Sequence, residues 1–185
     1  MDLRVAMVGL AHGHGTGFLK SLATLPGVKV VGFFDSENPQ AARQAAEEFG
    51  APAYEDLDQL LRHAGANMML TAAINDRKAQ YIVKAIDAGL HCMADKPLVS
   101  SMEELESIED ALARNKSVKL YLMLTERFNA ALATAKQLVD RGEIGRVANI
   151  VAIRPHRLNP DSRPAWMFDS RRYGGILNDI GIHDL

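Results

Sequence analysis

The sequence predicts an α/β protein with a parallel β-sheet, on the basis of three features. Short segments that are apolar almost throughout alternate along the chain with longer segments of helical periodicity, which is the pattern of βαβ units. A glycine-rich turn follows the first apolar segment, and an aspartate ends the second. The chain has 185 residues, 48% apolar and 24% charged, so it can bury a core and form one complete domain with part of a second.

The composition also argues against several classes of protein. Lys and Arg total 21 against 23 Asp and Glu, a net charge of -2, so we expect no broad basic surface for nucleic acid. No run of uncharged apolar residues is long enough for a membrane span. Cys92 is the only cysteine, which excludes an internal disulfide and leaves a metal cluster without its usual thiolates. We expect a cytoplasmic protein that binds neither nucleic acid nor a membrane.

Five segments are predicted to be strands of this sheet. Each is short and nearly apolar throughout, as strands covered on both faces should be. They are residues 3–9, 28–34, 67–72, 91–94 and 118–124.

The helices between these strands are marked by caps and by apolar stripes. In the helix after the second strand, Asn38 can cap, Pro39 suits the first turn and Gly50 ends the helix. Ser101 and Glu104 have the spacing of a capping box before a later helix. Apolar residues three and four positions apart predict helices over about residues 39–49, 56–64, 75–88 and 102–112.

The pattern changes after residue 124. One more helix is predicted from about residue 130 to 141, followed by a strand at 147–153 and an irregular connection rich in Arg and Pro. That strand exposes apolar side chains and an unpaired edge unless it pairs with another chain or with residues beyond 185. We therefore expect a first domain at 1–124 and the beginning of a second, incomplete domain at 125–185.

The glycine-rich turn runs from Gly9 to Gly17, between the first strand and a helix. Such a turn lets backbone N–H groups approach a pyrophosphate at the helix N-terminus, where the helix dipole favours negative charge. The G-x-G-x-x-G spacing is not met, because its positions hold Gly9, Ala11 and His14. A turn that binds nothing is the alternative. His12 and His14 also suggest a metal site, but the sequence places no carboxylate or thiolate nearby, so we predict no metal.

The second strand ends at Asp35. In a dinucleotide-binding fold an acid at this place accepts hydrogen bonds from the adenosine ribose hydroxyls. Its carboxylate would repel a 2′-phosphate, so the turn and the acid together predict NAD rather than NADP. Alternatively, Asp35 only starts the turn into the next helix.

Three residues are candidates for chemistry at a reacting hydroxyl group. Lys96 follows the fourth strand, at the strand end where open α/β sheets bind ligands, and can stabilise developing negative charge. Asp179 and His183 share a face if they lie on one helix, and a histidine titrates in the range that alcohol oxidation needs. The alternatives are a surface lysine paired with Asp95, and a helix-start acid beside a structural histidine.

In combination these motifs resemble those of the Gfo/Idh/MocA oxidoreductases. The resemblance extends over the whole chain and rests on the order of the motifs. They are Gly9-x-Ala11-x-x-His14, Asp35, Ala73-Ile74-Asn75, Asp95-Lys96-Pro97, Arg127-Phe128-Asn129, Gly142-Glu143-Ile144-Gly145, and Gly174-Gly175 followed by Asp179-x-x-x-His183. The resemblance implies a Rossmann dinucleotide-binding domain and then the start of an α+β C-terminal domain. It also implies oxidation or reduction of sugars, inositols or related polyhydroxy compounds with NAD or NADP.

The resemblance further implies a role for each site residue. Lys96 would contact the reacting hydroxyl and the nicotinamide, His183 would be the acid/base, and Asp179 its neighbour in the site. The cofactor-binding residues would be Gly9, Leu10, Ala11, His12, Asp35, Ser36, Ala73, Asn75, Asp95 and Lys96. Family members run well beyond the Asp-x-x-x-His motif, so we expect a longer functional molecule, and a homo-oligomer formed through the C-terminal domain.

The chain also departs from the family pattern. Ala73-Ile74 replaces the usual Thr-Pro, Lys78 stands where a histidine is common, and Asp95 replaces the glutamate of the Glu-Lys-Pro motif. Two other functions therefore stay open: a nonenzymatic module that binds or senses NAD, and a structural domain that binds no dinucleotide. Cofactor affinity and turnover distinguish the three.

Overall fold

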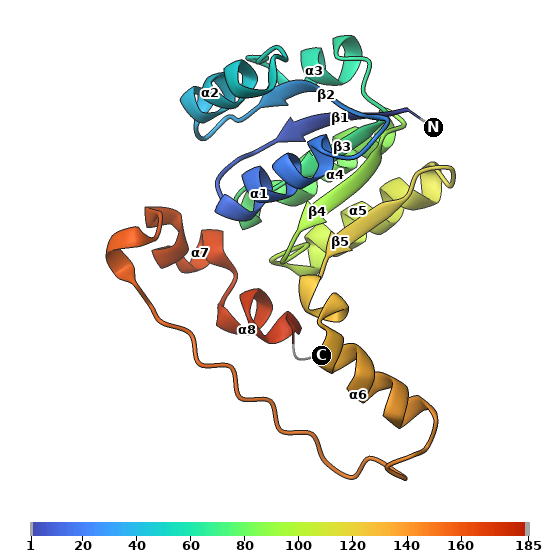
Figure 1. The fold of residues 1–185 in the computed structure, drawn as a ribbon. Coiled ribbons are helices and arrows are strands. Elements are labelled where there is room, and N and C mark those ends of the chain that lie inside the picture. Colours follow the sequence, from blue (N-terminus) through green and yellow to red (C-terminus); the bar gives the residue numbers. More distant parts are fainter. Residues whose placement is uncertain (1, 184–185) are drawn as a thin grey trace.

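The computed structural model describes residues 2–183, and its central element is a five-stranded sheet of order β2-β1-β3-β4-β5 (Figure 1). All four strand pairings are parallel, which confirms the predicted fold class. The strands are β1 (Leu3–Val8), β2 (Val28–Phe34), β3 (Met68–Thr71), β4 (His91–Asp95) and β5 (Leu120–Met123). Each observed strand begins and ends within two residues of the bounds expected from its apolar run.

Two helices of the sheet domain have the capping residues that the sequence predicts. Asn38 Oδ1 accepts a hydrogen bond from the Ala41 N–H at 3.1 Å, and Gly50 ends the same helix with a positive φ of 64°. Ser101 Oγ caps the later helix by accepting from the Glu104 N–H at 3.2 Å. The helices are α1 (Gly13–Ala23), α2 (Pro39–Phe49), α3 (Leu57–His63), α4 (Asn75–Asp87) and α5 (Met102–Arg114).

Helices cover both faces of the sheet, so the core has two halves (Figure 1). Val5 and Met7 belong to the half that contains buried residues of α1 and α2. Ala6 and Val8 belong to the half that contains buried residues of α3, α4 and α5. This alternation along β1 follows the period of two of a strand, and it explains why the strand is apolar at all four positions from Val5 to Val8.

One pairing beside β2 was not predicted from the sequence. Ala53 forms an isolated parallel bridge to Phe33, where the Phe33 N–H donates to Pro52 O at 2.9 Å and the Tyr54 N–H donates to Phe33 O at 2.8 Å. The bridge adds a rudimentary strand outside β2. With it, the strand order becomes that of a Rossmann dinucleotide-binding sheet, whose ligand crevice lies at the carboxyl ends of the strands.

After β5 the chain forms short helices joined by an extended connection (Figure 1). The helix predicted at 130–141 is confirmed as α6 (Ala130–Asp140). The short helix η1 (Thr125–Phe128) precedes α6. After α6 come the short elements η2 (Pro160–Ser162), η3 (Ala165–Phe168), α7 (Ser170–Tyr173), α8 (Ile176–Asp179) and η4 (Gly181–His183). Among residues 2–183, no helix has the length and apolar character needed to cross a membrane.

The prediction of a strand at 147–153 is wrong. The segment has no regular secondary structure, and Ile150, Val151 and Ile153 are 77%, 74% and 86% exposed. A strand needs hydrogen-bonding neighbours, and none of the residues from 2 to 183 pairs with this segment. The sequence therefore has strand character at a place where the described chain offers no partner strand.

Candidate active site

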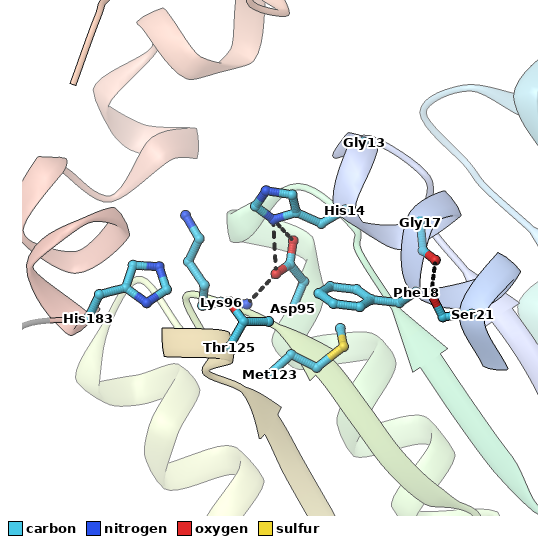
Figure 2. Close-up of a pocket in the computed structure, with 10 residues that line it drawn as sticks. All are labelled: Gly13, His14, Gly17, Phe18, Ser21, Asp95, Lys96, Met123, Thr125 and His183. Carbon is cyan, nitrogen blue, oxygen red and sulfur yellow. Dashed lines mark hydrogen bonds and ion pairs between the residues drawn. The ribbon is translucent and has the colours of Figure 1, made fainter. Parts of the chain in front are cut away.

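A cavity of about 490 Å³ lies at the carboxyl end of the sheet, between α1, the end of β4 and the C-terminal segment (Figure 2). Its walls come from segments that are far apart in the sequence, which places the glycine-rich turn, Lys96 and His183 around one space. The lining residues are Gly13, His14, Gly17, Phe18, Ser21, Asp95, Lys96, Met123, Thr125 and His183. The topology explains the position, because the strand ends of a parallel sheet meet at one edge.

The Lys96 ammonium forms an ion pair with the Asp179 carboxylate and donates to the Asp179 backbone oxygen at 3.1 Å. Both residues are buried, at 7% and 4% exposed. The other carboxylate oxygen of Asp179 accepts a hydrogen bond from the Tyr173 hydroxyl at 2.7 Å. Burial alone would raise the pKa of Asp179, but the hydrogen bonds from Lys96 and Tyr173 bring that pKa below its ordinary value. An ionised Asp179 thus fixes the ammonium at the cavity wall.

His183 lies on the cavity wall as expected, but it does not share a helix with Asp179. Helix α8 ends at Asp179, and His183 belongs to the separate turn η4, because Ile180 ends the helix between them. Burial, and then the charges of Lys96 and Arg154, lower the pKa of His183, so its imidazole is neutral at pH 7. Its Nδ1 is buried and has no hydrogen-bond partner among residues 2–183. A neutral imidazole in this position is able to accept a proton.

Lys78 is a functional candidate that the sequence identified only as a departure from the family pattern. Its side chain is 1% exposed, and its ammonium donates to Asp95 O at 3.0 Å and to Pro97 O at 2.7 Å. Burial lowers its pKa to about 8. These two bonds hold the backbone turn from which Lys96 extends into the cavity.

The fold brings a carboxylate to the two histidines of the glycine-rich turn, which corrects the expectation that none lies nearby. Asp95 Oδ2 at the end of β4 lies 3.2 Å from His14 Nδ1 and 3.7 Å from His12 Nδ1 (Figure 2 draws the His14 contact). The other oxygen of Asp95 accepts from the Lys96 backbone N–H at 2.9 Å. The alternative pairing of Lys96 with Asp95 through their side chains is wrong, since the Lys96 ammonium is paired with Asp179.

The glycine-rich turn has the space that a pyrophosphate needs at the start of α1. A Cβ added to Gly9, whose φ is +75°, would lie 2.5 Å from Ala73 Cα, so only glycine allows the turn to pass this loop. At Gly13, in contrast, an added Cβ would have no described atom within 4 Å apart from its chain neighbours and the backbone of its own helix, and this residue begins α1. The residues therefore fit a dinucleotide with its phosphates at the N-terminus of α1.

The Asp35 carboxylate stabilises the turn after β2 and can still accept a further hydrogen bond. Its Oδ1 accepts from the N–H groups of Glu37 at 2.8 Å and Asn38 at 3.0 Å, as the turn-starting alternative predicts. Among the described residues 2–183, its Oδ2 accepts only from the Leu10 N–H, at 2.7 Å. A carboxylate oxygen has two lone pairs, so Oδ2 retains one for a ribose hydroxyl.

The remaining predicted cofactor residues surround this crevice in different ways. Ala73 packs against Gly9, and the Ser36 hydroxyl lies 2.6 Å from the Tyr81 hydroxyl. Asn75 is 4% exposed, and its amide nitrogen donates to Tyr173 O at 2.8 Å, so it binds the C-terminal segment.

Arg172 is a second link to the C-terminal segment that the sequence did not indicate. It binds Glu37 Oε2 at 2.7 Å and lies 3.5 Å from Asp76 Oδ2. This ion pair and the Asn75 bond together hold α7 against the crevice.

Comparisons with known proteins agree with this architecture. Residues 3–123 match the family described as "Oxidoreductase family, NAD-binding Rossmann fold", and residues 132–185 match the "GFO/IDH/MocA C-terminal domain". Glucose-6-phosphate 3-dehydrogenase of Bacillus subtilis (strain 168) is 28% identical over 181 residues, which are 95% of this chain and 49% of that protein. The scyllo-inositol 2-dehydrogenase (NAD(+)) of the same organism is 29% identical over 185 residues, 99% of this chain and 52% of that protein.

Among solved structures, scyllo-inositol dehydrogenase from Lactobacillus casei with bound NAD(H) and scyllo-inositol is similar to this chain. Its TM-score is 0.71 at 28% identity, covering 78% of this chain and 43% of that one. The chain spans about half the length of the curated relatives it matches.

Proposed function

The chain belongs to the Gfo/Idh/MocA oxidoreductase family, and from this premise we propose that it supplies the cofactor domain and the catalytic residues of an NAD-dependent dehydrogenase. The substrate class is a sugar, an inositol or a related polyhydroxy compound, oxidised at one CH–OH group. The observation that carries the proposal is the cavity that Lys96 and His183 share beside the glycine-rich turn. A fixed ammonium and a neutral imidazole are the two groups that reversible oxidation of a hydroxyl needs.

The cofactor would be held along the crevice from β2 to β4. The turn from Gly9 to His12 would bind the pyrophosphate, Asp35 and Ser36 the adenosine ribose, and the loop with Ala73 would border the dinucleotide. A bound nicotinamide supplies the acceptor for the hydride that leaves the substrate carbon. Asp95 and Lys96, at the end of β4, would stand at that reacting end of the crevice.

In oxidation, His183 would accept the proton of the substrate hydroxyl. The Lys96 ammonium would donate a hydrogen bond to the same oxygen and stabilise its developing negative charge. Asp179 would hold that ammonium in its orientation, and Tyr173 would orient Asp179. In reduction the proton returns from His183 to the oxygen. Asp179 would therefore be a positioning partner of Lys96, a role that was not expected from the sequence.

A substrate screen tests the proposed function. The complete protein is incubated with NAD and single sugars, inositols or sugar acids, and NADH formation is followed by absorbance at saturating cofactor. We expect turnover with at least one polyhydroxy compound. Dinucleotide binding without turnover on any of them would favour the nonenzymatic module instead, and no binding at all would favour the structural domain.

We expect NAD to bind more tightly than NADP by about tenfold or more, equal to ~1.4 kcal/mol. The reason is repulsion between the Asp35 carboxylate and an added 2′-phosphate. Arg43 lines a neighbouring cavity together with Asp35 and Ser36, so Asp35→Ser should leave a cation there and shift the preference toward NADP. Calorimetry with both cofactors measures this, with the exposed acid variant Asp110→Ser as control. Equal or tighter binding of NADP to the unchanged protein would rule out this role of Asp35.

We also propose that residues 1–124 form the dinucleotide-binding domain and that residues 125–185 begin a C-terminal substrate and oligomerisation domain. The exposed apolar side chains at 150–153 support this proposal, because such a segment is stable in water only when another strand covers it. Limited proteolysis and analytical ultracentrifugation of the 185-residue chain should show cleavage near this segment or self-association. A protease-resistant monomer would contradict the domain assignment.

A further inference from the structure

Three metal-ligating side chains from two parts of the chain surround one point beside the active-site cavity. His12 caps α1 and His14 lies in its first turn, while Asp95 ends β4. One ligand atom from each of the three lies within 4.8 Å of the others. We propose that His12, His14 and Asp95 bind one divalent transition-metal ion of the Zn²⁺ type.

Two of the distances between ligand atoms are close to those of a metal site. Zinc bonds of about 2.0–2.2 Å to nitrogen and oxygen at tetrahedral angles place two ligand atoms about 3.3 Å apart. Asp95 Oδ2 lies 3.2 Å from His14 Nδ1 and 3.7 Å from His12 Nδ1. All three ligand atoms lie within 4.8 Å of one another, so side-chain rotations of the histidines would bring them and the carboxylate to one ion.

The hydrogen bonds around the three side chains show which contacts a bound ion would replace or compete with. His12 Nδ1 accepts a long hydrogen bond, 3.5 Å, from the His14 N–H, so this nitrogen carries a lone pair. The backbone N–H of Lys96 binds Asp95 Oδ1 at 2.9 Å, which fixes the carboxylate and leaves Oδ2 toward the histidines. An ion at the centre would replace the proton shared between His14 and Asp95.

The charges near this point favour a bound cation. Asp95 is 2% exposed and brings a carboxylate into a partly closed space, where a cation partner stabilises it. The neighbouring Lys96 ammonium is already paired with Asp179, and Lys78 faces the backbone oxygens of Asp95 and Pro97. Two imidazoles and one carboxylate are the ligand types that zinc and similar divalent ions select.

The site has an open side. His14 and Asp95 line the same cavity of about 490 Å³ as Lys96 and His183, and three protein ligands leave one position of a tetrahedral ion without a protein ligand. Zinc sites with three protein ligands bind water or a substrate oxygen in this fourth position. The site therefore has the form of an accessible metal centre and differs from closed structural zinc sites.

Metal titration of the tag-free protein tests the proposal in the absence of dinucleotide, so the result does not depend on the proposed dehydrogenase activity. Co²⁺ is added while its visible absorption is recorded, and Zn²⁺ binding is measured by equilibrium dialysis. We expect one ion per chain. His12→Ala, His14→Ala and Asp95→Asn should each weaken binding about 100-fold or more, since even outer-shell changes cost 10- to 100-fold.

His156→Ala provides the matched control, because it removes an exposed histidine outside the triad and should leave the affinity unchanged. Thermal unfolding without metal verifies that each variant is folded, and Zn²⁺ should raise the melting temperature of the unchanged protein but not of the His14 variant. Absence of one-to-one binding, or equal affinity in the triad variants and the control, would overturn the proposal.

Discussion

Replacing Lys96 or His183 with alanine in the complete protein is expected to lower turnover by roughly 10²- to 10⁴-fold, the usual cost of losing one positioned acid/base group. The affinity for NAD should change little, because both side chains face the reacting oxygen at one end of the crevice. Steady-state NADH formation gives turnover, and calorimetry gives cofactor affinity. Lys116→Ala and His156→Ala remove exposed residues of the same types and should retain full activity.

The Lys96→Ala variant needs a second variant as a control. Asp179 is buried, and without Lys96 its charge would have no partner. Breaking a buried ion pair from one side costs about 3–5 kcal/mol, which is enough to unfold many domains. Lys96→Ala combined with Asp179→Asn removes both charges, and it should be folded and still inactive. Near-normal turnover in a folded variant of either residue would assign that residue a structural role.

The pH dependence offers an independent test of His183. Its pKa is lowered by burial first and then by nearby positive charge, so the imidazole stays neutral to a lower pH than an ordinary histidine. A general base must be neutral to accept a proton, so oxidation should decline as pH falls through this lowered pKa, below about 6.5. The acidic limb of the profile should disappear in His183→Ala.

The sheet domain was predictable because its signals are local. Period-two burial, helical stripes and capping residues such as Asn38 and Gly50 each lie within one element, and all agree. The bridge at Ala53 was missed because one residue pair has no periodicity. The segment at 147–153 was misassigned because strand propensity predicts a strand only where a partner strand is present. The described chain provides no such partner strand.

The candidate site was predictable only in its parts. Lys96, Asp179 and His183 were chosen by motif, and the cavity contains or adjoins all three, but their pairing was expected differently. The contact between Lys96 and Asp179 joins positions 83 residues apart, and the approach of Asp95 to His14 joins positions 81 apart. Sequence spacing has no information on such contacts, since they depend on how the strand ends converge.

Replacing Lys78 with methionine should reduce turnover substantially while changing the substrate KM less, although Lys78 touches no substrate in the proposed site. The substitution keeps an apolar stem in the core but removes the donor to Asp95 O and Pro97 O, which leaves two buried carbonyl groups without it. An unsatisfied buried group costs about 1–3 kcal/mol, so the midpoint of denaturant unfolding should fall. The larger effect is expected on rate, because a displacement of about 1 Å at a reacting group can cost 10²-fold.

The control for this prediction is Lys84→Met on the same helix, α4, where the lysine is exposed and pairs with Asp58 at 2.8 Å. An exposed ion pair contributes at most about 1 kcal/mol, so stability and turnover should stay near normal. Lys78→Arg retains a charge, but the larger guanidinium does not fit where Lys78 is only 1% exposed. This variant should therefore not rescue turnover. If Lys78→Met loses stability but keeps its kcat, Lys78 stabilises the core and does not position Lys96.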